Sequence, residues 1–314
     1  MMTDSLQVKL TTLRQVISDM QSVLVAYSGG IDSTVVLKIA HEQLGEQALG
    51  LTAVSPTFPM VELTGAKQVA IEIGARHELV HTDQLEIPAF VQNDAARCFH
   101  CKTDLYQLLD GLREPRASKW IADGTNLDDL GDDRPGIKAA REWGIRSPLV
   151  EASLSKSDVR ALAQMLGLSN WNKPAAACLS SRIPRGVPIT IEKLRRVEEA
   201  EDILHAEGFH HMRVREHGEV ARIEVGADDF PRLNQPDMRA HISARLRKVG
   251  FRFICVDLEG YRPGGVSLSC PPDPSTIADK TLTAPQAPHL QIFGGPLRSG
   301  SAARLSPQPS KPGQ

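Results

Sequence analysis

The sequence lacks the features of a secreted, membrane-spanning or nucleic-acid-binding protein. Its 36 Lys and Arg residues are balanced by 38 Asp and Glu residues, so no excess of positive charge indicates DNA or RNA as a partner. No apolar run reaches the length that crosses a bilayer, and the first residues lack the long apolar region of a signal peptide. We therefore expect a cytoplasmic protein with neither a nucleic-acid nor a membrane partner.

Cysteine is also scarce, with five residues in 314. In a chain without a leader peptide, this number indicates a reducing compartment, where cysteines act as ligands, nucleophiles or apolar core residues rather than in disulfides. The length of the chain is sufficient for a large core and indicates two domains.

An apolar run at 23–27 leads directly into a loop of sequence SGGIDS, and a helical apolar pattern follows. The candidate phosphate-binding residues of this loop are Ser28, Gly29, Gly30, Asp32 and Ser33. Glycine lets backbone N–H groups approach an anion, and the positive end of the following helix favours negative charge. The loop lacks the GK[ST] of P-loops and the GxGxxG of dinucleotide folds. We interpret it as a pyrophosphate cradle; the alternative is an ordinary Gly-rich turn.

Further apolar runs at 48–54, 78–81 and 120–122 predict strands, and an amphipathic pattern at 61–73 predicts a helix. This alternation is typical of an α/β fold, a parallel sheet with helices on both faces. Ligands of such sheets bind beyond the carboxyl ends of the strands. A capping pattern predicts another helix at 155–167, to which we assign a structural role.

The segment DGTNLDD at 123–129 should lie at the same edge of the sheet as the SGGIDS loop, because it follows the predicted strand at 120–122. Its candidate nucleotide-binding residues are Gly124, Asn126 and Asp129. Asp128 and Asp129 suit Mg²⁺, which is commonly held by one or two carboxylates together with phosphate oxygens. The alternative is an acidic surface turn.

Three of the cysteines are candidate metal ligands. Cys98 and Cys101 form a CxxC pair, which is compatible with a zinc half-site, a redox pair or two ligands of an iron–sulfur cluster. The surrounding sequence disfavours a thioredoxin-type pair, and a closed zinc site would need a fourth ligand, such as His77 or His81. Together with Cys178, the pair suits a [4Fe–4S] cluster in which one iron stays open to exogenous sulfide.

Beyond residue 188 the pattern predicts a smaller α+β domain. The expected elements are a helix at 189–207, strands at 212–215 and 221–225, a helix at 238–248 and a strand at 251–258. Cys255, in the last strand, is expected to be a buried apolar side chain. The expected divisions of the chain are 1–170, a cysteine-bearing loop at 171–188, 189–262, and a Pro/Ser/Gly-rich tail at 263–314. We expect this tail to be largely disordered, because it cannot bury enough apolar area to offset its ordering entropy.

Arg213 and Arg215 alternate on one predicted strand and therefore share a face, which Arg222 could join from the partner strand. The planar guanidinium group of arginine suits phosphate recognition. The alternative is a solvated face of the strand.

Six segments occur in the order found in the LarE family, whose members are ATP-dependent sulfur transferases that mature the nickel-pincer cofactor of lactate racemase. The segments are SGGIDS, RCFHCK, DGTNLDD, KPAAACLSSRIPRG, HMRVREHGEVARIEV and DLEGYR, over roughly residues 10–262. SGGIDS resembles the PP-loop of the whole ATP pyrophosphatase superfamily, whereas ACLSSRIPRG around Cys178 is more specific to LarE proteins.

This resemblance implies a PP-loop fold, similar to that of the adenine nucleotide alpha hydrolases, and a reaction that splits ATP into AMP and pyrophosphate. AMP would be attached to a carboxylate of pyridinium-3,5-biscarboxylic acid mononucleotide, and sulfur would then replace it to give a thiocarboxylate. Some family members sacrifice a single cysteine, which ends as dehydroalanine. Others carry two further cysteines, matching Cys98 and Cys101, and pass on sulfide bound to a cluster. This chain resembles the second kind.

Roles for individual residues follow from the resemblance. Cys178, Asp32 and Arg182 would be catalytic, with the charge of Arg182 lowering the proton affinity of the sulfur nucleophile. Cys98 and Cys101 would join Cys178 as ligands of a [4Fe–4S] cluster. The implied cofactors are therefore ATP, Mg²⁺ and this cluster.

The implied partner is a small-molecule mononucleotide, whose phosphate Arg213 and Arg215 would bind. We also expect a homo-oligomer that makes transient contacts with other cofactor-maturation proteins. Other functions stay open on the residues alone. They are a tRNA thiolation enzyme, disfavoured by the neutral charge, and a PP-loop amidotransferase synthetase, disfavoured because no glutaminase segment is evident. A non-catalytic adenine-nucleotide sensor or iron–sulfur carrier is a third possibility, and nucleotide turnover would distinguish it.

Overall fold

The strand β1 (Val23–Ala26) lies inside a parallel sheet and is apolar on both faces. The computed structural model describes residues 4–131, 135–174 and 177–262. The order of the sheet is β3 (Arg76–His81), β2 (Ala48–Val54), β1 and β4 (Trp120–Ala122), and all neighbours run parallel. The chain winds from β1 to β3 on one side and returns to β4 on the other. The loops after β1 and β4 therefore flank the switch point where sheets of this kind bind ligands.

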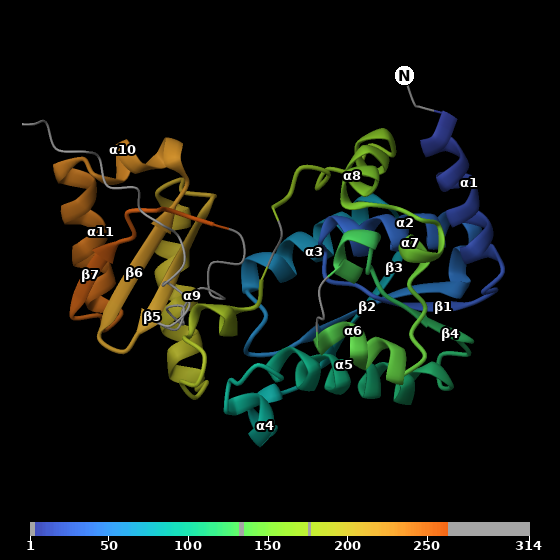
Figure 1. Ribbon diagram of the computed structural model, residues 1–314, viewed down its shortest axis with the longest axis horizontal. Coiled ribbons are helices and arrows are strands. Elements are labelled where there is room, and N and C mark those ends of the chain that lie inside the picture. Colours follow the sequence, from blue (N-terminus) through green and yellow to red (C-terminus); the bar gives the residue numbers. More distant parts are fainter. Residues whose placement is uncertain (1–3, 132–134, 175–176, 263–314) are drawn as a thin grey trace, which may run out of the picture. The chain divides into compact units, whose positions relative to one another are not determined.

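Helices cover both faces of this sheet (Figure 1). On one face, Val23 and Val25 pack with α1 (Asp4–Ser18), α2 (Ile31–Leu44) and α8 (Lys156–Met165). On the other face, Leu24 packs with α5 (Arg97–Arg113) and α6 (Pro135–Glu142). The other helices in this part are α3 (Met60–Glu72), α4 (Pro88–Val91) and α7 (Pro148–Glu151). Successive side chains of a strand point to opposite faces, so an apolar strand needs cover on both. The predicted α/β fold is confirmed.

A small mixed sheet follows in the C-terminal part of the described chain. β5 (Met212–His217) pairs antiparallel with β6 (Val220–Val225), and β7 (Phe253–Val256) runs parallel to β6. Two parallel strands need a crossover connection, which contains α10 (Phe230–Leu233) and α11 (Pro236–Lys248). These helices share an apolar core with α9 (Ile191–Ala206) and the sheet. The predicted hairpin and the predicted α+β character are confirmed.

The prediction that Cys255 is buried is wrong. In β7, Ile254 and Val256 pack against the core, whereas Phe253 and Cys255 are exposed. β7 lies at the edge of the small sheet, and its successive side chains point to opposite faces. Only alternate residues of an apolar run in such a strand therefore face the core.

Two other expectations are not tested by the fold. The predicted boundaries at residues 170 and 188 stay a prediction, and the expected disorder of residues 263–314 concerns a segment outside the described residues. Within residues 4–131, 135–174 and 177–262, none of the helices combines the length and the apolar character that a bilayer span requires.

Gly29 shows how closely the loop after β1 packs on its neighbours. Its φ is +71°, and a Cβ at this position would lie 2.6 Å from the Cβ of Ala66 in α3. Gly144 has a similar φ of +62°, but a Cβ there would meet nothing within 4 Å. The two glycines thus share the backbone conformation that disfavours other residues and differ in the space around them.

We therefore expect Gly29→Ala to lower the free energy of unfolding by clearly more than Gly144→Ala. The control substitution should cost roughly 1–2 kcal/mol, the strain of a left-handed backbone. Gly29→Ala adds the clash with α3 to that strain. Urea unfolding of both variants measures the difference, and equal losses would show that the contact with Ala66 is not important.

Candidate active site

Hydrogen bonds of the Ser33 hydroxyl group hold the SGGIDS loop together. The amide of Ser28 donates to Ser33 Oγ at 3.2 Å, and Ser33 Oγ donates to the carbonyl of Gly30 at 3.2 Å. Gly30 is the N-cap residue of α2, and no side chain caps this helix end. The first amides of α2 are therefore oriented as an anion-binding helix N-terminus would require.

Asp32 links this loop to the DGTNLDD segment. Its Oδ1 accepts a hydrogen bond from Asn126 Nδ2 at 3.2 Å, and its Oδ2 forms an ion pair with Lys156. A Cβ on Gly124 would lie 2.7 Å from the amide nitrogen of Ser33, so the two segments are in backbone contact there. The structure thus brings together the two loops that the sequence placed at one edge of the sheet. The nucleotide-binding roles of their residues stay predictions.

The acidic residues of the DGTNLDD segment accept hydrogen bonds from different donors. Asp128 Oδ2 accepts from the amide of Lys156 at 2.9 Å, and Asp129 Oδ2 accepts from the amide of Asn126 at 3.1 Å. Asp123 is buried and accepts from the Tyr106 hydroxyl at 3.0 Å. In the described ranges, no group of three or more His, Cys, Asp or Glu side chains is arranged to hold a metal ion. The predicted role of Asp128 and Asp129 in binding Mg²⁺ therefore depends on additional oxygens from phosphate.

Lys156 is a site residue that the sequence analysis missed. The predicted capping box of α8 is present, with Ser155 and Asp158 as its partners, but the helix is more than structural. Its first residue, Lys156, carries its ammonium group to Asp32. A cation in the first turn opposes the helix dipole, and this unfavourable placement was the signal available in the sequence.

Asn170 is a second residue that no motif indicated. It is buried, and its Nδ2 donates to the carbonyl of Gly29 at 3.1 Å and to Thr34 Oγ1 at 2.9 Å. These bonds tie the chain beyond α8 to both ends of the SGGIDS loop. Asparagine is too common in turns for its position alone to predict this contact.

Three buried arginines bind the backbone of the Cys178 loop. Arg182 donates to the carbonyls of Ala177 and Cys178 at 2.6 and 2.9 Å. Arg97, at the start of α5, donates to the carbonyl of Ser180 at 2.9 Å, and Arg215 of β5 donates to that of Ser181 at 2.9 Å. All three side chains are about 95% buried or more, so the geometry of this loop depends on their charges being compensated.

Carboxylates supply that compensation for two of the arginines. Glu201 of α9 binds Arg182 in a bidentate pair at 2.8 and 2.9 Å, and Glu224 of β6 binds Arg215 at the same distances. The predicted catalytic role of Arg182 and the predicted phosphate contact of Arg215 stay predictions. In this structure both guanidinium groups bind a carboxylate and the loop backbone. Arg213 is only half-buried, and its guanidinium lies 5.1 Å from the ring centroid of Tyr261.

The three candidate cysteine ligands lie close enough to influence one another. Cys98 and Cys101 occupy the first turns of α5, the helix that Arg97 begins. Burial raises the pKa of the Cys101 thiol to about 12, and negative charge on Cys178 and on Cys98 adds to this increase. Cys178 therefore lies near enough to act electrostatically on Cys101, but among the described residues the three thiols do not form a group arranged to hold a metal ion, and their role as cluster ligands stays a prediction.

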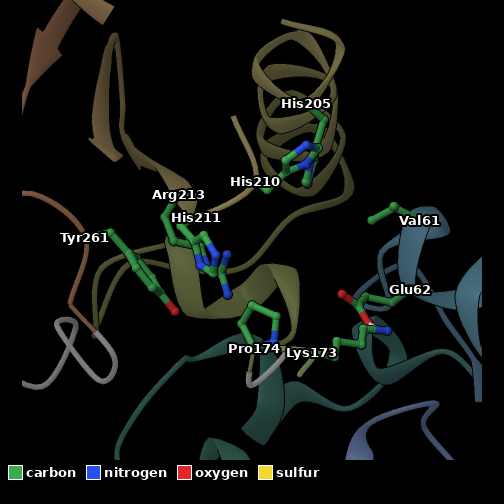
Figure 2. A pocket seen from close by; sticks show the side chains of 9 residues that line it. All are labelled: Val61, Glu62, Lys173, Pro174, His205, His210, His211, Arg213 and Tyr261. Carbon is green, nitrogen blue, oxygen red and sulfur yellow. Dashed lines mark ion pairs between the residues drawn. The ribbon is translucent and has the colours of Figure 1, made fainter. Parts of the chain in front are cut away.

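A cavity of about 260 Å³ lies between α3, the segment just before the Cys178 loop and the start of β5 (Figure 2). Lys173 and Pro174, just before the Cys178 loop, form part of its wall, and Arg213 and Tyr261 form another part. Lys173 forms an ion pair with Glu62 of α3 at 2.6 Å.

Comparison with known proteins identifies the family. A model of the asparagine synthase family matches residues 11–98, which contain the SGGIDS loop. An uncharacterised protein of Synechocystis sp. is 43% identical over 82% of this chain and 97% of its own length. An uncharacterised protein of Methanocaldococcus jannaschii is 30% identical over 77% of this chain and 91% of its own length. The pyridinium-3,5-bisthiocarboxylic acid mononucleotide synthase of Lactiplantibacillus plantarum is 39% identical over 83% of this chain and 94% of that enzyme. The chain belongs to the LarE family.

As a LarE protein, the chain is an ATP-dependent sulfurtransferase with a PP-loop fold. The resemblance seen in the six sequence motifs is thereby confirmed. The family match supports ATP as a ligand of this chain, and its binding where the loops after β1 and β4 meet stays a prediction.

We expect Lys156→Ala to reduce AMP formation from ATP about tenfold or more, in kcat/KM, because a charge-assisted bond near the leaving pyrophosphate is lost. Lys138→Ala is the matched control, since Lys138 is an exposed residue of α6 that pairs only loosely with Glu142 at 3.9 Å. A pyrophosphate-release assay measures both variants. Equal activity of the two variants would contradict a role of Lys156 at the nucleotide.

Alkylation of the iron-free protein at pH 8 should separate the cysteines. Cys101 is expected to resist iodoacetamide, because its pKa of about 12 keeps the thiol protonated until the solution becomes strongly alkaline. Exposed Cys255 should react readily. Peptide mass spectrometry measures the labelling, with urea-denatured protein as the control in which both react. Equal labelling of the two thiols in the folded protein would contradict the raised pKa of Cys101.

Proposed function

We propose that this LarE protein attaches AMP to a carboxylate of pyridinium-3,5-biscarboxylic acid mononucleotide and converts that carboxylate into a thiocarboxylate. The relative from L. plantarum is a pyridinium-3,5-bisthiocarboxylic acid mononucleotide synthase, which supports this substrate. The observation that carries the proposal is the bond from the Leu179 amide to the carbonyl of Thr57, at 2.9 Å. Thr57 follows β2 at the carboxyl edge of the parallel sheet. The bond therefore fastens the Cys178 loop to the edge where we propose that ATP binds.

The first step needs ATP because a carboxylate oxygen is a poor leaving group. An oxygen of the substrate carboxylate attacks the α-phosphorus, and the bond to the β-phosphate oxygen breaks as pyrophosphate leaves. The leaving group gains negative charge beside the amides of Gly29 and Gly30 and the N-terminus of α2. These dipoles are already oriented before the reaction, which lets them stabilise the transition state.

Mg²⁺ would be held at this edge by Asp128 and Asp129 together with phosphate oxygens, and it would neutralise charge on the pyrophosphate. These carboxylates follow β4 at the carboxyl edge of the parallel sheet, which makes the assignment chemically suitable. Lys156 contributes a further positive charge, because its ammonium group already lies at Asp32.

In the second step a sulfur nucleophile attacks the carbonyl carbon of the adenylate, and the bond to the AMP oxygen breaks. Arg182 holds the carbonyls of Ala177 and Cys178 and so orients the loop that carries the sulfur chemistry. We propose that Cys98, Cys101 and Cys178 hold a [4Fe–4S] cluster, which when bound supplies the sulfide. Cysteine thiolates are the protein ligands that such clusters take, and Cys178 and Cys98 both act electrostatically on Cys101.

Free thiols and such a cluster require a reducing compartment, so the proposed location is the cytoplasm. A homo-oligomeric state and transient contacts with other cofactor-maturation proteins stay predictions.

Protein purified without oxygen should contain about four irons per chain, as a [4Fe–4S] centre requires. Changing Cys98, Cys101 or Cys178 to serine should lower the iron content and end sulfur transfer beyond one turnover. Formation of AMP should persist in these variants, because the SGGIDS loop is separate from the cysteines. Iron analysis and thiocarboxylate formation under excess substrate are the measurements.

Cys255→Ser is the matched control, since Cys255 is exposed on β7 and lies outside the proposed ligand set. It should keep both iron and turnover. An iron-free Cys98→Ser, Cys101→Ser variant that still makes thiocarboxylate, with loss of one H₂S from Cys178, would show that the cysteine is sacrificed and would refute the cluster.

A further inference from the structure

Gln84 is a buried polar residue that lies outside the six sequence motifs. It begins a 3₁₀-helical turn (Gln84–Glu86) shortly after β3, and it is only 3% exposed. Its Nε2 donates to Asp104 Oδ2 at 3.0 Å, and its Oε1 accepts from Thr57 Oγ1 at 3.4 Å, which is the longer and weaker of the two bonds. A buried carboxamide left unpaired at either end is costly, so the two bonds together fix the orientation of this side chain.

Asp104 sets the direction of these bonds. It lies on α5, three residues after Cys101, and it accepts the hydroxyl of Thr82 at 2.7 Å in addition to the amide group of Gln84. Because a carboxylate accepts hydrogen bonds and has none to donate, it must face the side-chain nitrogen of Gln84 and not the oxygen. The carboxamide oxygen is thereby turned toward Thr57.

Thr57 connects this carboxamide to the Cys178 loop. It is buried, and its carbonyl accepts from the Leu179 amide at 2.9 Å. Its hydroxyl also lies 3.0 Å from Ser55 Oγ, which is able to donate to Thr57 while Thr57 donates to the carboxamide. Three hydrogen bonds therefore lead from α5 to the amide next to Cys178.

An apolar cluster includes residues from the same segments. Leu179 is one of its buried members, and Leu85 and Cys101 pack against it. The turn that begins at Gln84 therefore supports the Cys178 loop through apolar packing as well as through hydrogen bonds. Apolar contacts are non-directional, so it is the hydrogen bonds that specify the position of the loop backbone.

We propose that Gln84 is a positioning residue for the sulfur-transfer step. Through Asp104 and Thr57 it holds the Cys178 loop in a fixed position relative to α5, which carries the cysteine pair. The adenylate can also react with water: a water oxygen attacks its carbonyl carbon and the bond to the AMP oxygen breaks, which gives AMP, the carboxylate and protons. A fixed loop favours sulfur over water, because a reaction between two bound groups is fast only in the correct geometry. This inference rests on the proposed function, which supplies the adenylate and the sulfur nucleophile.

The amount of thiocarboxylate formed per pyrophosphate released tests the inference in the full-length protein. Gln84→Leu removes both hydrogen bonds at a similar side-chain size. It should lower this ratio about threefold or more, as expected for the loss of a buried hydrogen bond, and leave the rate of pyrophosphate release near that of the parent protein. A smaller folded fraction would lower both products equally and leave the ratio unchanged. Enzyme in excess of pyridinium-3,5-biscarboxylic acid mononucleotide limits the reaction to one turnover, so the ratio is defined for either source of sulfur.

Gln68→Leu is the matched control, because Gln68 is an exposed residue of α3 that bonds to Glu72 at 3.3 Å. It should keep the ratio of the parent protein.

A second pair of variants tests the direction of the bonds. Gln84→Glu places a carboxylate against Asp104 and should lower the ratio as Gln84→Leu does. Adding Asp104→Asn returns a donor to this contact, with the charge moved from α5 to the turn, and should recover most of the lost ratio. No such rescue is expected if Gln84 only fills space. Iron content is measured in each variant, so that a loss of the cluster is not mistaken for a loss of position.

A parent-like ratio in a folded Gln84→Leu variant would overturn the inference. If that variant does not fold, the comparison of Gln84→Glu with and without Asp104→Asn decides, and equal ratios in these two proteins would overturn it.

Hydrogen exchange separates a failure of the inference from a failure of the proposed function. Without any substrate, peptides that contain Leu179 should exchange faster in Gln84→Leu than in the parent protein, since a loosened loop exposes its amide to water. Gln68→Leu should exchange as the parent does. A parent protein that forms no thiocarboxylate would refute the proposed function, and the exchange rates would still decide whether Gln84 holds the loop. Unchanged exchange at Leu179 would show that it does not.

Discussion

The Cys178 loop depends on buried positive charge. Its carbonyl groups accept hydrogen bonds from Arg97, Arg182 and Arg215, which come from α5, from the loop itself and from β5. Removing one partner of a buried ion pair costs about 3–5 kcal/mol, because the other charge is left uncompensated. Glu201 and Glu224 are therefore as important for the position of Cys178 as the arginines that touch the loop.

One of these buried arginines, Arg97, also connects the Cys178 loop to the pair Cys98 and Cys101. Arg97 binds Ser180 through one hydrogen bond and Asn93 through another, at 2.7 Å, and it immediately precedes Cys98. Asn93 has a φ of +57°, and its side-chain amide donates to the carbonyls of Pro184 and Val187 at 2.8 and 2.9 Å. One short segment thus fixes the start of α5 against both sides of the Cys178 loop. A shift of either element would move the other.

The helix α5 also reaches the nucleotide edge. Tyr106, five residues after Cys101 in α5, donates its hydroxyl to Asp123 at the start of the DGTNLDD segment. The ammonium group of Lys102 lies 5.4 Å from the Tyr106 ring centroid. The charges of Tyr106 and Asp123 raise the pKa of Lys102, although burial opposes this change. The helix α5 thus contacts the DGTNLDD segment and also carries the cysteine pair, which would give the two steps of the proposed reaction a common support.

Patterns among neighbouring residues were sufficient to predict the local elements and the family. The apolar run at 48–54 predicted β2 with its observed bounds, and the alternation at 212–225 predicted the hairpin. Six motifs predicted a LarE protein. These predictions were possible because periodicity and loop chemistry are properties of neighbouring residues. Only the tertiary structure decided which charged groups meet. The pairing of Arg215 with Glu224, the contact of Lys156 with Asp32 and the exposure of Cys255 depend on strand register and on packing between distant segments. A side chain's neighbours across such distances leave no periodic signal in the sequence, so these contacts required the fold.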